Sequence, residues 1–309
     1  MSYAFVFPGQ GSQSIGMMNG FEDFPIVRET FSEASDILDQ DLWGLVSNGP
    51  AELLNQTVNT QPLMLAAGVA IYRAWTCLSD SRPSFLAGHS LGEYSALVAS
   101  GALAFSDALP LVRFRAMSMQ QAVPEGKGGI AAILGLDDDA VRAVCLEAGQ
   151  GEVLEAVNFN SPGQVVIAGQ REAVMRGMEA AKGKGAKRAI MLPMSVPSHC
   201  SLMKPAAEAL RQYLRNVTIG NPEMAVLHNV DVMPHEDPDE IREALVAQLY
   251  HPVRWVETIR TLALEGIGQV AECGPGKVLA GLNKRIEPAQ AVLALTDGVA
   301  LKEAVAILI

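Results

Sequence analysis

Short apolar runs that end at a glycine or a proline alternate with helix-length amphipathic stretches through most of this sequence. The first run, Tyr3-Ala-Phe-Val-Phe7, stops at Pro8-Gly9, and another, Ser84-Phe-Leu-Ala87, stops at Gly88. Uninterrupted apolar strands are typical of a parallel sheet covered by helices on both faces. We therefore predict an α/β fold. The expected strands are 3–7, 84–87, 225–229, 269–272 and 291–294, and the expected helices are 25–38, 50–55, 62–78, 91–100, 107–122, 202–214, 239–250, 253–264 and 277–286.

The segment 126–194 has a different order of elements. Strands are expected at 130–136, 154–159, 164–168 and 187–192, and helices at 138–148 and 172–182. This β-α-β-β-α-β order is that of a ferredoxin-like unit. We predict a small ferredoxin-like subdomain at 126–194, inserted into a large subdomain that is made of 1–125 and 195–309.

Composition excludes several classes of protein. The hydrophobic fraction of 49% argues against a disordered chain, and 23 Lys+Arg against 34 Asp+Glu give a net charge of −11, which argues against nucleic acid as a partner. The longest apolar run, 63–72, is too short to span a bilayer. Residues 1–11 have no basic start followed by an apolar stretch, so we expect no secretory signal. The four cysteines include no CxxC pair, so we expect no metal site, no disulfide framework, no membrane partner and a cytoplasmic location.

The strongest candidate site is the pentapeptide Gly88-His-Ser-Leu-Gly92, a G-x-S-x-G motif. An apolar strand precedes it and a helix-forming segment follows it, which is the setting of a nucleophile elbow. The glycines permit the tight turn, and the helix dipole stabilises negative charge at its start. The motif therefore indicates a nucleophilic Ser90, whereas the competing interpretation is a turn in which Ser90 only caps the helix.

A serine nucleophile needs a base, and the chain has five histidines. His199 is preferred, because it lies in the polar segment Val196-Pro-Ser-His-Cys-Ser201 at the junction of the two predicted subdomains. The remaining four have other expected places: His89 beneath the turn, His228 in a strand, His235 in an acidic loop and His251 at a helix end.

Three further segments resemble functional motifs without fitting them. Cys200 is a rival nucleophile, but adjacent side chains rarely point at each other, so a pair with His199 has poor geometry. Pro8-Gly-Gln-Gly-Ser-Gln13 lacks the third glycine of a dinucleotide fingerprint, and Gly274-Pro-Gly-Lys277 lacks the spacing of a P-loop. The backbone N–H groups around Gln10 could instead form part of an oxyanion hole.

Taken together, these segments resemble the malonyl-CoA:acyl-carrier-protein transacylases, the FabD-type enzymes of type II fatty-acid synthesis. The resemblance covers nearly the whole chain. Its motifs are Phe7-Pro-Gly-Gln-Gly-Ser-Gln13, Thr60-Gln-Pro62, Gly88-His-Ser-Leu-Gly-Glu-Tyr-Ser95, Arg113-Phe-Arg115, Asn158-Phe-Asn-Ser-Pro-Gly-Gln164, Val196-Pro-Ser-His199, Gln248-Leu-Tyr-His-Pro-Val253 and Gly274-Pro-Gly-Lys277. It implies an α/β-hydrolase-like large subdomain with a parallel sheet and an inserted ferredoxin-like small subdomain, in agreement with the order of elements.

The resemblance also implies how the catalytic residues work. Ser90 would be the acyl nucleophile and His199 its base. The backbone N–H groups of Gln10 and Leu91 would form the oxyanion hole. The main-chain carbonyl of Gln248, rather than a carboxylate, would orient the histidine.

Arg115 determines the substrate that the resemblance implies. Composition alone favours a solvent-exposed helix arginine at this position. In the family the matching arginine pairs with the free carboxylate of the malonyl group, and the planar guanidinium fork suits a carboxylate. An acetyl group would leave Arg115 unpaired. Asn160 would lie near the site.

The implied reaction is ping-pong transfer of the malonyl group from malonyl-CoA to the phosphopantetheine thiol of holo acyl carrier protein, with no permanently bound cofactor and no metal. Several alternatives stay open. The same fold could serve polyketide synthesis or a malonate decarboxylase. A serine hydrolase shares the elbow, although no acid between Ser90 and His199 stands out as its third member. A non-catalytic scaffold for carrier proteins would not need these residues.

The net charge of −11 is unfavourable for docking acidic carriers or the phosphates of coenzyme A, so the distribution of the cations matters. We predict that one of two basic clusters binds them, although ordinary solvated turns have the same pattern. The first cluster is Lys182, Lys184, Lys187 and Arg188, and the second is Lys284 and Arg285.

Overall fold

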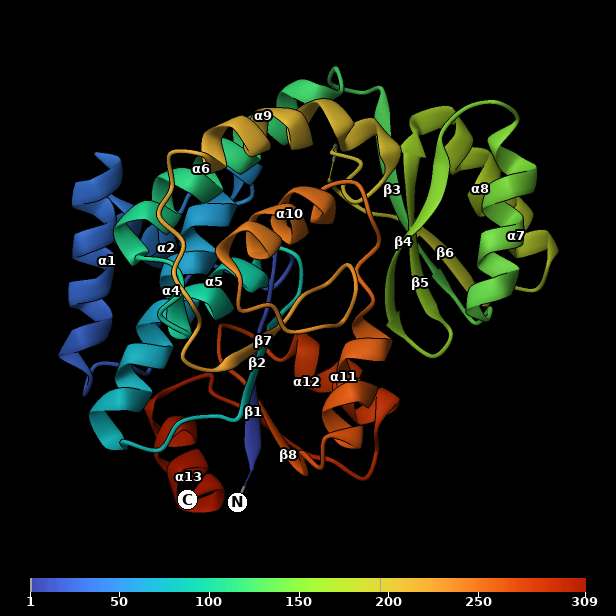
Figure 1. The fold of residues 1–309 in the computed structure, drawn as a ribbon. Helices are drawn as coiled ribbons and strands as arrows, with labels where there is room; N and C mark the ends of the chain where they lie inside the picture. The colour runs from blue at the N-terminus through green and yellow to red at the C-terminus, as the bar shows by residue number, and fades with distance from the viewer. Residues whose placement is uncertain (1, 195) are drawn as a thin grey trace.

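The computed structural model describes residues 2–194 and 196–309 and contains two β-sheets, each with its own helices (Figure 1). Met1 and Ser195, which begin the two predicted segments of the large subdomain, lie outside the described residues. The combination of sheets and covering helices confirms the predicted α/β class.

The larger sheet has five parallel strands in the order β7-β2-β1-β8-β9. The strands are β1 (Tyr3–Phe7), β2 (Phe85–Gly88), β7 (Ala225–Leu227), β8 (Gln269–Glu272) and β9 (Ala291–Ala294). Phe5 lies opposite Leu86 on one side and Ala271 on the other. All five residues of β1 are buried, as expected for a central strand of a sheet that is covered on both faces.

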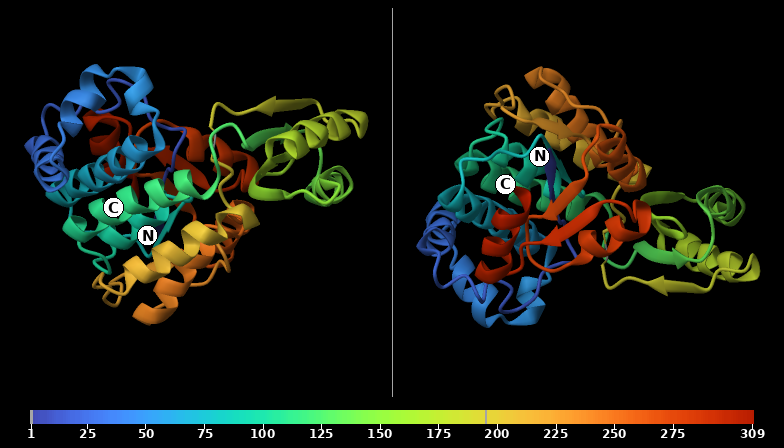
Figure 2. Two further views of the ribbon diagram at one scale, coloured as in Figure 1. Left: turned by 90° about the horizontal axis from the view of Figure 1, so that it is seen from above. Right: turned by 90° about the horizontal axis from the view of Figure 1, so that it is seen from below.

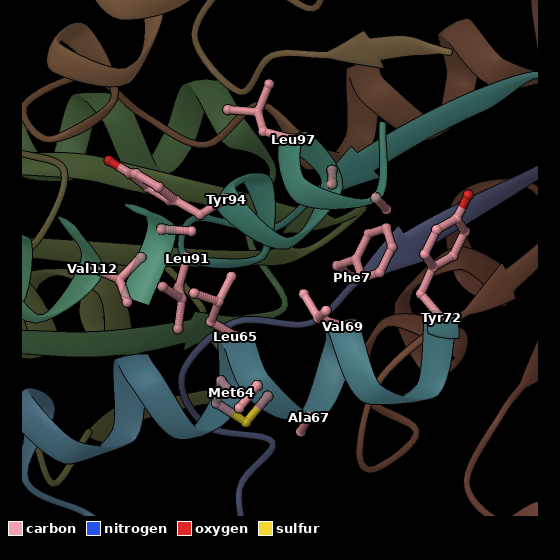
Figure 3. Packing of buried hydrophobic residues seen from close by; sticks show 14 of the residues in the cluster. Phe7, Met64, Leu65, Ala67, Val69, Tyr72, Leu91, Tyr94, Leu97 and Val112 are labelled. Atoms are coloured by element: carbon pink, nitrogen blue, oxygen red, sulfur yellow. The ribbon is translucent and has the colours of Figure 1, made fainter. Parts of the chain in front are cut away.

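Helices pack on both faces of this sheet (Figures 1 and 2). The helices of the larger body are α1 (Pro25–Leu38), α2 (Leu42–Asn48), α3 (Ala51–Leu54), α4 (Thr57–Leu78), α5 (Gly92–Ala99), α6 (Phe105–Ala122), α9 (Lys204–Leu214), α10 (Pro238–Gln248), α11 (Trp255–Leu264), α12 (Val278–Ile286) and α13 (Gly298–Leu308). The short 3₁₀ turn η1 (Ser201–Met203) precedes α9. Among these helices, α5 and α12 contact the strands, whereas α1 packs on α4, and α9 packs on α6. Because side chains alternate along a strand, Phe7 of β1 packs in the core with α4, whereas Val6 packs with Trp255 of α11. Figure 3 shows Phe7 beside Val69 and Tyr72 of α4.

The second sheet has four antiparallel strands in the order β4-β5-β3-β6. Its elements are β3 (Gly128–Leu134), α7 (Asp138–Gly149), β4 (Leu154–Ser161), β5 (Gln164–Gln170), α8 (Arg171–Gly183) and β6 (Arg188–Met191). This is the predicted β-α-β-β-α-β order with ferredoxin-like pairing. Placing the subdomain boundaries at 125/126 and 194/195 stays a prediction.

The small sheet, coloured green to yellow in Figure 2, projects from one side of the larger body. Two backbone hydrogen bonds join them, because Val253, just before α11, accepts from Phe159 and donates to Val157. Residues of β4 therefore reach the carboxyl ends of the parallel strands, where ligand sites form in open α/β sheets.

Several helices differ from their expected bounds. Helices α2 and α13 were not predicted, and α4 begins five residues before the expected start at Pro62. Pro62 instead lies inside α4, in a fully buried turn, so core packing outweighs the hydrogen bond that proline cannot donate. Across the described ranges, no helix combines the length and the apolar character that crossing a membrane requires.

Candidate active site

Ser90 lies in the sharp turn that joins β2 to α5, and its backbone is in the left-handed region with φ of 53°. The two flanking glycines make this turn possible. A Cβ at Gly92 would lie 2.0 Å from the main-chain oxygen of Phe7, and one at Gly88 would lie 1.9 Å from the carbonyl carbon of Gly92. The two glycines thus let the turn pack closely against β1, and Ser90 lies beyond the end of β2, at the start of α5.

His199 is hydrogen-bonded to the Ser90 hydroxyl, with 2.7 Å between Nε2 and Oγ. Its other ring nitrogen, Nδ1, lies 2.7 Å from the main-chain oxygen of Gln248. A carbonyl can only accept, so Nδ1 carries the ring proton and Nε2 is left as the acceptor for the serine proton. Burial, reinforced by the positive charge of Arg115, lowers the pKa of His199 to about 3. The imidazole is therefore neutral at physiological pH and able to act as a base.

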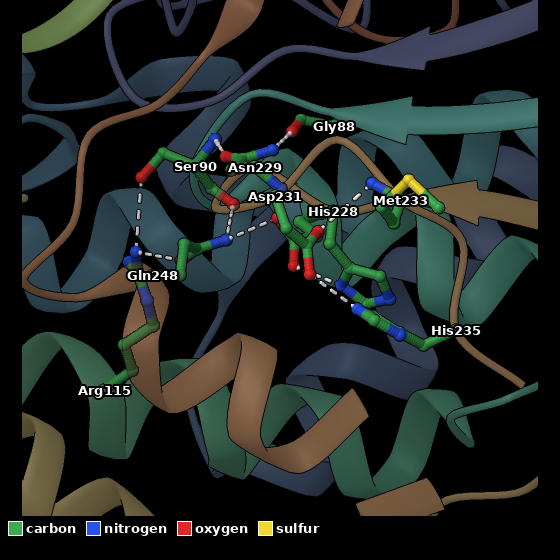
Figure 4. Close-up of polar contacts among 10 residues, drawn as sticks. Gly88, Ser90, Arg115, His228, Asn229, Asp231, Met233, His235 and Gln248 are labelled. Carbon is green, nitrogen blue, oxygen red and sulfur yellow. Dashed lines mark hydrogen bonds and ion pairs between the residues drawn. The ribbon is translucent and has the colours of Figure 1, made fainter. Parts of the chain in front are cut away.

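Arg115 projects from α6 into the same site and is only 1% exposed, so the interpretation of a solvent-exposed helix arginine is wrong. Its Nη1 donates to Gln61 Oε1 at 2.9 Å. Its Nη2 donates to Gln248 Oε1 at 2.9 Å and to Ser90 Oγ at 3.2 Å (Figure 4). All three acceptors are neutral, and burial lowers the pKa of Arg115. A buried guanidinium without a direct carboxylate partner is suited to binding an anionic ligand.

A cavity of about 70 Å³ lies in front of the serine hydroxyl, between the two sheets. Its lining includes Gln10, Gln61, His89, Ser90, Leu91, Arg115, Met119, Ile130, Asn158 and His199. Five of the predicted site residues thus face one space. Asn160 does not line it; its side chain lies 2.8 Å from the ring of His89, and Asn158 takes the place at the cavity wall.

The backbone of Gln10 approaches the elbow through Gly9. A Cβ at Gly9 would lie 2.4 Å from the main-chain oxygen of His89, so only glycine allows this approach. Within 2–194 and 196–309, neither Gln10 N–H nor Leu91 N–H has a hydrogen-bond acceptor. Two free donors beside one cavity provide the geometry of an oxyanion hole.

The other histidines lie where they cannot replace His199. His89 contacts Asn160 and the ring of Trp255, which agrees with the expected place beneath the turn. His228 directly follows β7 and is fully buried against Glu93, His235 pairs with Asp231 near the surface, and His251 is exposed beyond α10. Cys200 is buried, its Sγ donates to the main-chain oxygen of Pro197 at 3.1 Å, and burial raises its pKa to about 12. That thiol is a poor nucleophile.

Three residues of the site were not singled out from the sequence. Gln61 holds Arg115, and Asn229 accepts from Ser90 N–H at 2.8 Å while it donates to Gly88 O at 2.6 Å. The third is Glu93, a fully buried carboxylate in α5. Local signals mark the positions of two of them, though not their partners: Glu93 is an acidic residue in an otherwise apolar helix, and Asn229 lies just beyond a parallel strand, whereas Gln61 has no such signal.

The two basic clusters approach the same end of the small sheet. Lys187 N–H donates to the main-chain oxygen of Leu134, and Arg285 of α12 donates to Gln164. Leu134 and Gln164 are paired in register. On the helical face, Lys182 and Lys184 instead form ion pairs with Glu179 and Glu147. Arg188 begins β6, and Lys284 lies beside Arg285. Nowhere in the described part of the chain do three or more His, Cys, Asp or Glu side chains gather in a way that could hold a metal ion.

Comparison with known proteins assigns the family. A family model described as "Acyl transferase domain" matches residues 4–285. This match, together with the fold and the site, places the chain among the acyl transferases. The malonyl CoA-acyl carrier protein transacylase of Escherichia coli strain K12 is 53% identical over 303 residues, or 98% of each chain. This chain belongs to the malonyl CoA-acyl carrier protein transacylase family.

Solved structures agree with this assignment. The crystal structure of an acyl-carrier-protein S-malonyltransferase from Burkholderia pseudomallei 1710b has a TM-score of 0.98 at 58% identity, and covers 99% of this chain and 100% of that one. A malonyl-transacylase solved in complex with a holo type II PKS acyl-carrier protein has a TM-score of 0.98 at 51% identity, over 99% and 100% of the two chains.

Proposed function

We propose that this protein transfers the malonyl group of malonyl-CoA to the phosphopantetheine thiol of an acyl carrier protein, through a malonyl-serine intermediate, and so supplies fatty-acid elongation. The observation that carries the proposal is the position of the buried Arg115 guanidinium, 3.2 Å from a serine hydroxyl that lies 2.7 Å from a neutral histidine. A base on one side of the nucleophile and a fixed cation on the other suit an acyl group that ends in a carboxylate.

In the first half-reaction, His199 Nε2 takes the hydroxyl proton while Ser90 Oγ attacks the thioester carbon. The N–H groups of Gln10 and Leu91 donate to the oxyanion of the tetrahedral intermediate. When the C–S bond breaks, the protonated His199 returns the proton to the departing thiolate. Free coenzyme A and malonyl-Ser90 are the products.

In the second half-reaction, the carrier thiol enters the position that coenzyme A has left. His199 takes the thiol proton, the sulfur attacks the ester carbon, and collapse of the intermediate breaks the C–O bond to Ser90. The proton returns to Oγ, which restores the free enzyme and gives ping-pong kinetics. Every step uses groups of this chain, so we propose that the reaction needs no resident cofactor or metal and that malonyl-CoA acts only as substrate.

Selection of the acyl group rests on Arg115 in this proposal. The malonyl carboxylate would take charge-assisted hydrogen bonds from the guanidinium, which an acetyl group cannot accept. A site whose buried polar groups stay unpaired with the wrong substrate discriminates strongly. We assign Asn160 the supporting role of holding the ring of His89, from which it lies 2.8 Å away.

Carrier docking is assigned to the end of the small sheet where the two basic clusters meet. Lys187, Arg188, Lys284 and Arg285 have no carboxylate partner among the ion pairs of the described residues, unlike Lys182 and Lys184. Free cations attract acidic partners more strongly than paired ones. We also propose that the enzyme works in the cytoplasm, because all four cysteines are free thiols.

The proposed function is tested by mass spectrometry of the intact protein after mixing with malonyl-CoA and then with holo acyl carrier protein. We expect a malonyl adduct on Ser90 that persists in buffer and is lost when the carrier is added, together with the appearance of malonyl-carrier. Ser90→Ala should form no adduct. Rapid loss of the adduct in buffer alone would instead identify a hydrolase, and an adduct on Ser90→Ala would refute the serine mechanism.

A further inference from the structure

A buried carboxylate lies directly behind the nucleophile, where the proposed mechanism does not use it. Glu93 is the second residue of α5 and is fully buried. Its Oε1 lies 2.8 Å from Nδ1 of His228. Its Oε2 accepts from Asn229 N–H and from Gln248 Nε2, both at 2.9 Å. Neither partner of Oε2 carries a charge, so on the side of Gln248 the carboxylate acts only as a hydrogen-bond acceptor.

Gln248 connects this carboxylate to the reacting groups. Its Nε2 donates both to Glu93 and, at 3.0 Å, to the main-chain oxygen of Ser90. Because both acceptors are on one side, the amide NH₂ must face them, and Oε1 must face Arg115. With the amide reversed, NH₂ would meet the guanidinium, donor against donor, and an oxygen would meet the carboxylate. Glu93 thus fixes the direction of the amide together with the Ser90 main-chain oxygen and Arg115.

The direction of the Gln248 amide determines how the guanidinium of Arg115 is oriented toward the cavity. Gln248 Oε1 is one of two side-chain amide oxygens that hold the guanidinium, and the other belongs to Gln61. Figure 4 shows Gln248 beside both Arg115 and Ser90, hydrogen-bonded to the guanidinium and to the Ser90 main-chain oxygen. Burial lowers the pKa of Arg115, and Tyr94 and the nearby charge of Glu93 oppose this effect. Because the carboxylate acts through an amide, the guanidinium face toward the cavity stays available to a ligand.

We propose that Glu93 is a positioning residue that sets selectivity for an acyl group with a free carboxylate, by fixing the amide of Gln248 and through it the guanidinium of Arg115. The inference rests on the proposed function, since selectivity for malonyl has meaning only for a malonyl transferase. Glu93 is not among the residues that line the cavity, and the side-chain partners of the serine hydroxyl are His199 and Arg115.

Two variants of Glu93 distinguish the hydrogen bond that it accepts from Gln248 from the space that its side chain fills. Glu93→Ala removes one of the two acceptors of the Gln248 NH₂, so the amide is held less firmly, by Arg115 and the Ser90 main-chain oxygen alone. Glu93→Gln keeps an oxygen for the two donors, and its NH₂ can face Nδ1 of His228. The ring proton of His228 can then move to Nε2, which has no hydrogen-bond partner among the described residues. We expect the first variant to lose selectivity and the second to retain it.

The readout is the ratio of the acylation rates of Ser90 by malonyl-CoA and by acetyl-CoA, measured by quenched-flow mass spectrometry. This ratio is independent of the fraction of folded enzyme, so a merely structural role would not change it. Glu93→Ala should lower the ratio roughly 10- to 100-fold, the loss expected for a hydrogen bond to a charged group. Glu93→Gln should stay within about 3-fold of the parent protein. If Glu93→Ala does not fold, Glu93→Asp replaces it with the same expectation, because its oxygens are withdrawn by one methylene.

Glu272 provides the matched control, because it and Glu93 are the two buried carboxylates among the described residues. Glu272 accepts from Leu279 and Ala280 N–H at the start of α12 and does not line the cavity. Glu272→Ala should lower stability and leave the ratio unchanged. An unchanged ratio in Glu93→Ala, or an equal loss in Glu93→Gln, would overturn the inference. A parent protein that did not prefer malonyl-CoA would refute the proposed function instead.

Discussion

The charge of Arg115 should set the pH range over which Ser90 reacts. Hydrogen bonds of 3.2 and 2.7 Å through the serine hydroxyl join the guanidinium to His199, so Arg115 Nη2 and His199 Nε2 can be no more than about 6 Å apart. A positive charge at this distance opposes protonation of the imidazole. Arg115→Met removes the charge while it keeps an unbranched side chain in the same space.

The size of the effect follows from Coulomb's law. At about 6 Å and an effective dielectric constant of about 20, the repulsion is roughly 3 kcal/mol, which corresponds to about 2 in pKa. The pKa of His199 in the parent protein is about 3, with burial as the larger cause. Arg115→Met should therefore raise it toward about 5, and burial should still keep it below the ordinary value of 6.5.

The assay is the rate of Ser90 labelling by a neutral fluorophosphonate probe between pH 4.5 and 8, because this probe does not need Arg115 for binding. His199 works as a base only when it is neutral, so labelling of the parent protein should be flat down to about pH 5. Labelling of Arg115→Met should fall to about half near pH 5. An inflection near pH 6.5 in the parent protein would refute the buried, neutral histidine, and identical profiles would refute the influence of Arg115.

Three further predictions concern the surface, the elbow and the core. Lys187→Glu combined with Arg188→Glu should weaken carrier binding about 10-fold in a titration, whereas Lys302→Glu, a change on the distant α13, should not; equal affinities would remove this docking site. Gly92→Ala should lower the melting temperature by about 5 °C or more, since its Cβ would meet the backbone of β1, and an unchanged melting curve would contradict the packing. Burial raises the pKa of Glu272 from 4.5 to about 7, so its contribution to stability is present below pH 4.5 and is lost as the pH rises through 7. The free energy of unfolding of Glu272→Gln, measured with urea relative to that of the parent protein, should therefore rise by about 3 kcal/mol between pH 4.5 and pH 8. A difference between the two proteins that does not change with pH would contradict this.

The fold was largely predictable because its strands are continuous apolar runs. The expected strands 269–272 and 291–294 match β8 and β9, and the order of elements in 126–194 matches the small sheet. The missed helix α2 has only seven residues and includes Gly44, and an Asp41 side chain starts it. Such a short segment forms through capping and tertiary packing, which periodicity does not report. Strand order is likewise a property of distant pairs and could not be read from local patterns.

The candidate site was predictable where one local motif carries the geometry. Gly88 and Gly92 indicated the elbow, and the structure gives each a steric reason. Asn229 and Gln61 could not be inferred in this way, because each acts on a residue far away in the sequence. The role of Glu93 was hidden for the same reason, since its partners lie 135 to 155 positions away.

The end of α10 holds both strained residues of the site, and this explains why their roles depend on each other. Ser90 and His199 each have a positive φ, 53° and 66°, which costs free energy unless the surroundings maintain it. Gln248 Nε2 binds the main-chain oxygen of Ser90, while its own main-chain oxygen binds the ring of His199. The next residue, Leu249, accepts from His199 N–H at 2.9 Å. One helix end therefore holds the nucleophile and the base 2.7 Å apart before any substrate arrives, so a displacement of α10 would disturb both residues together.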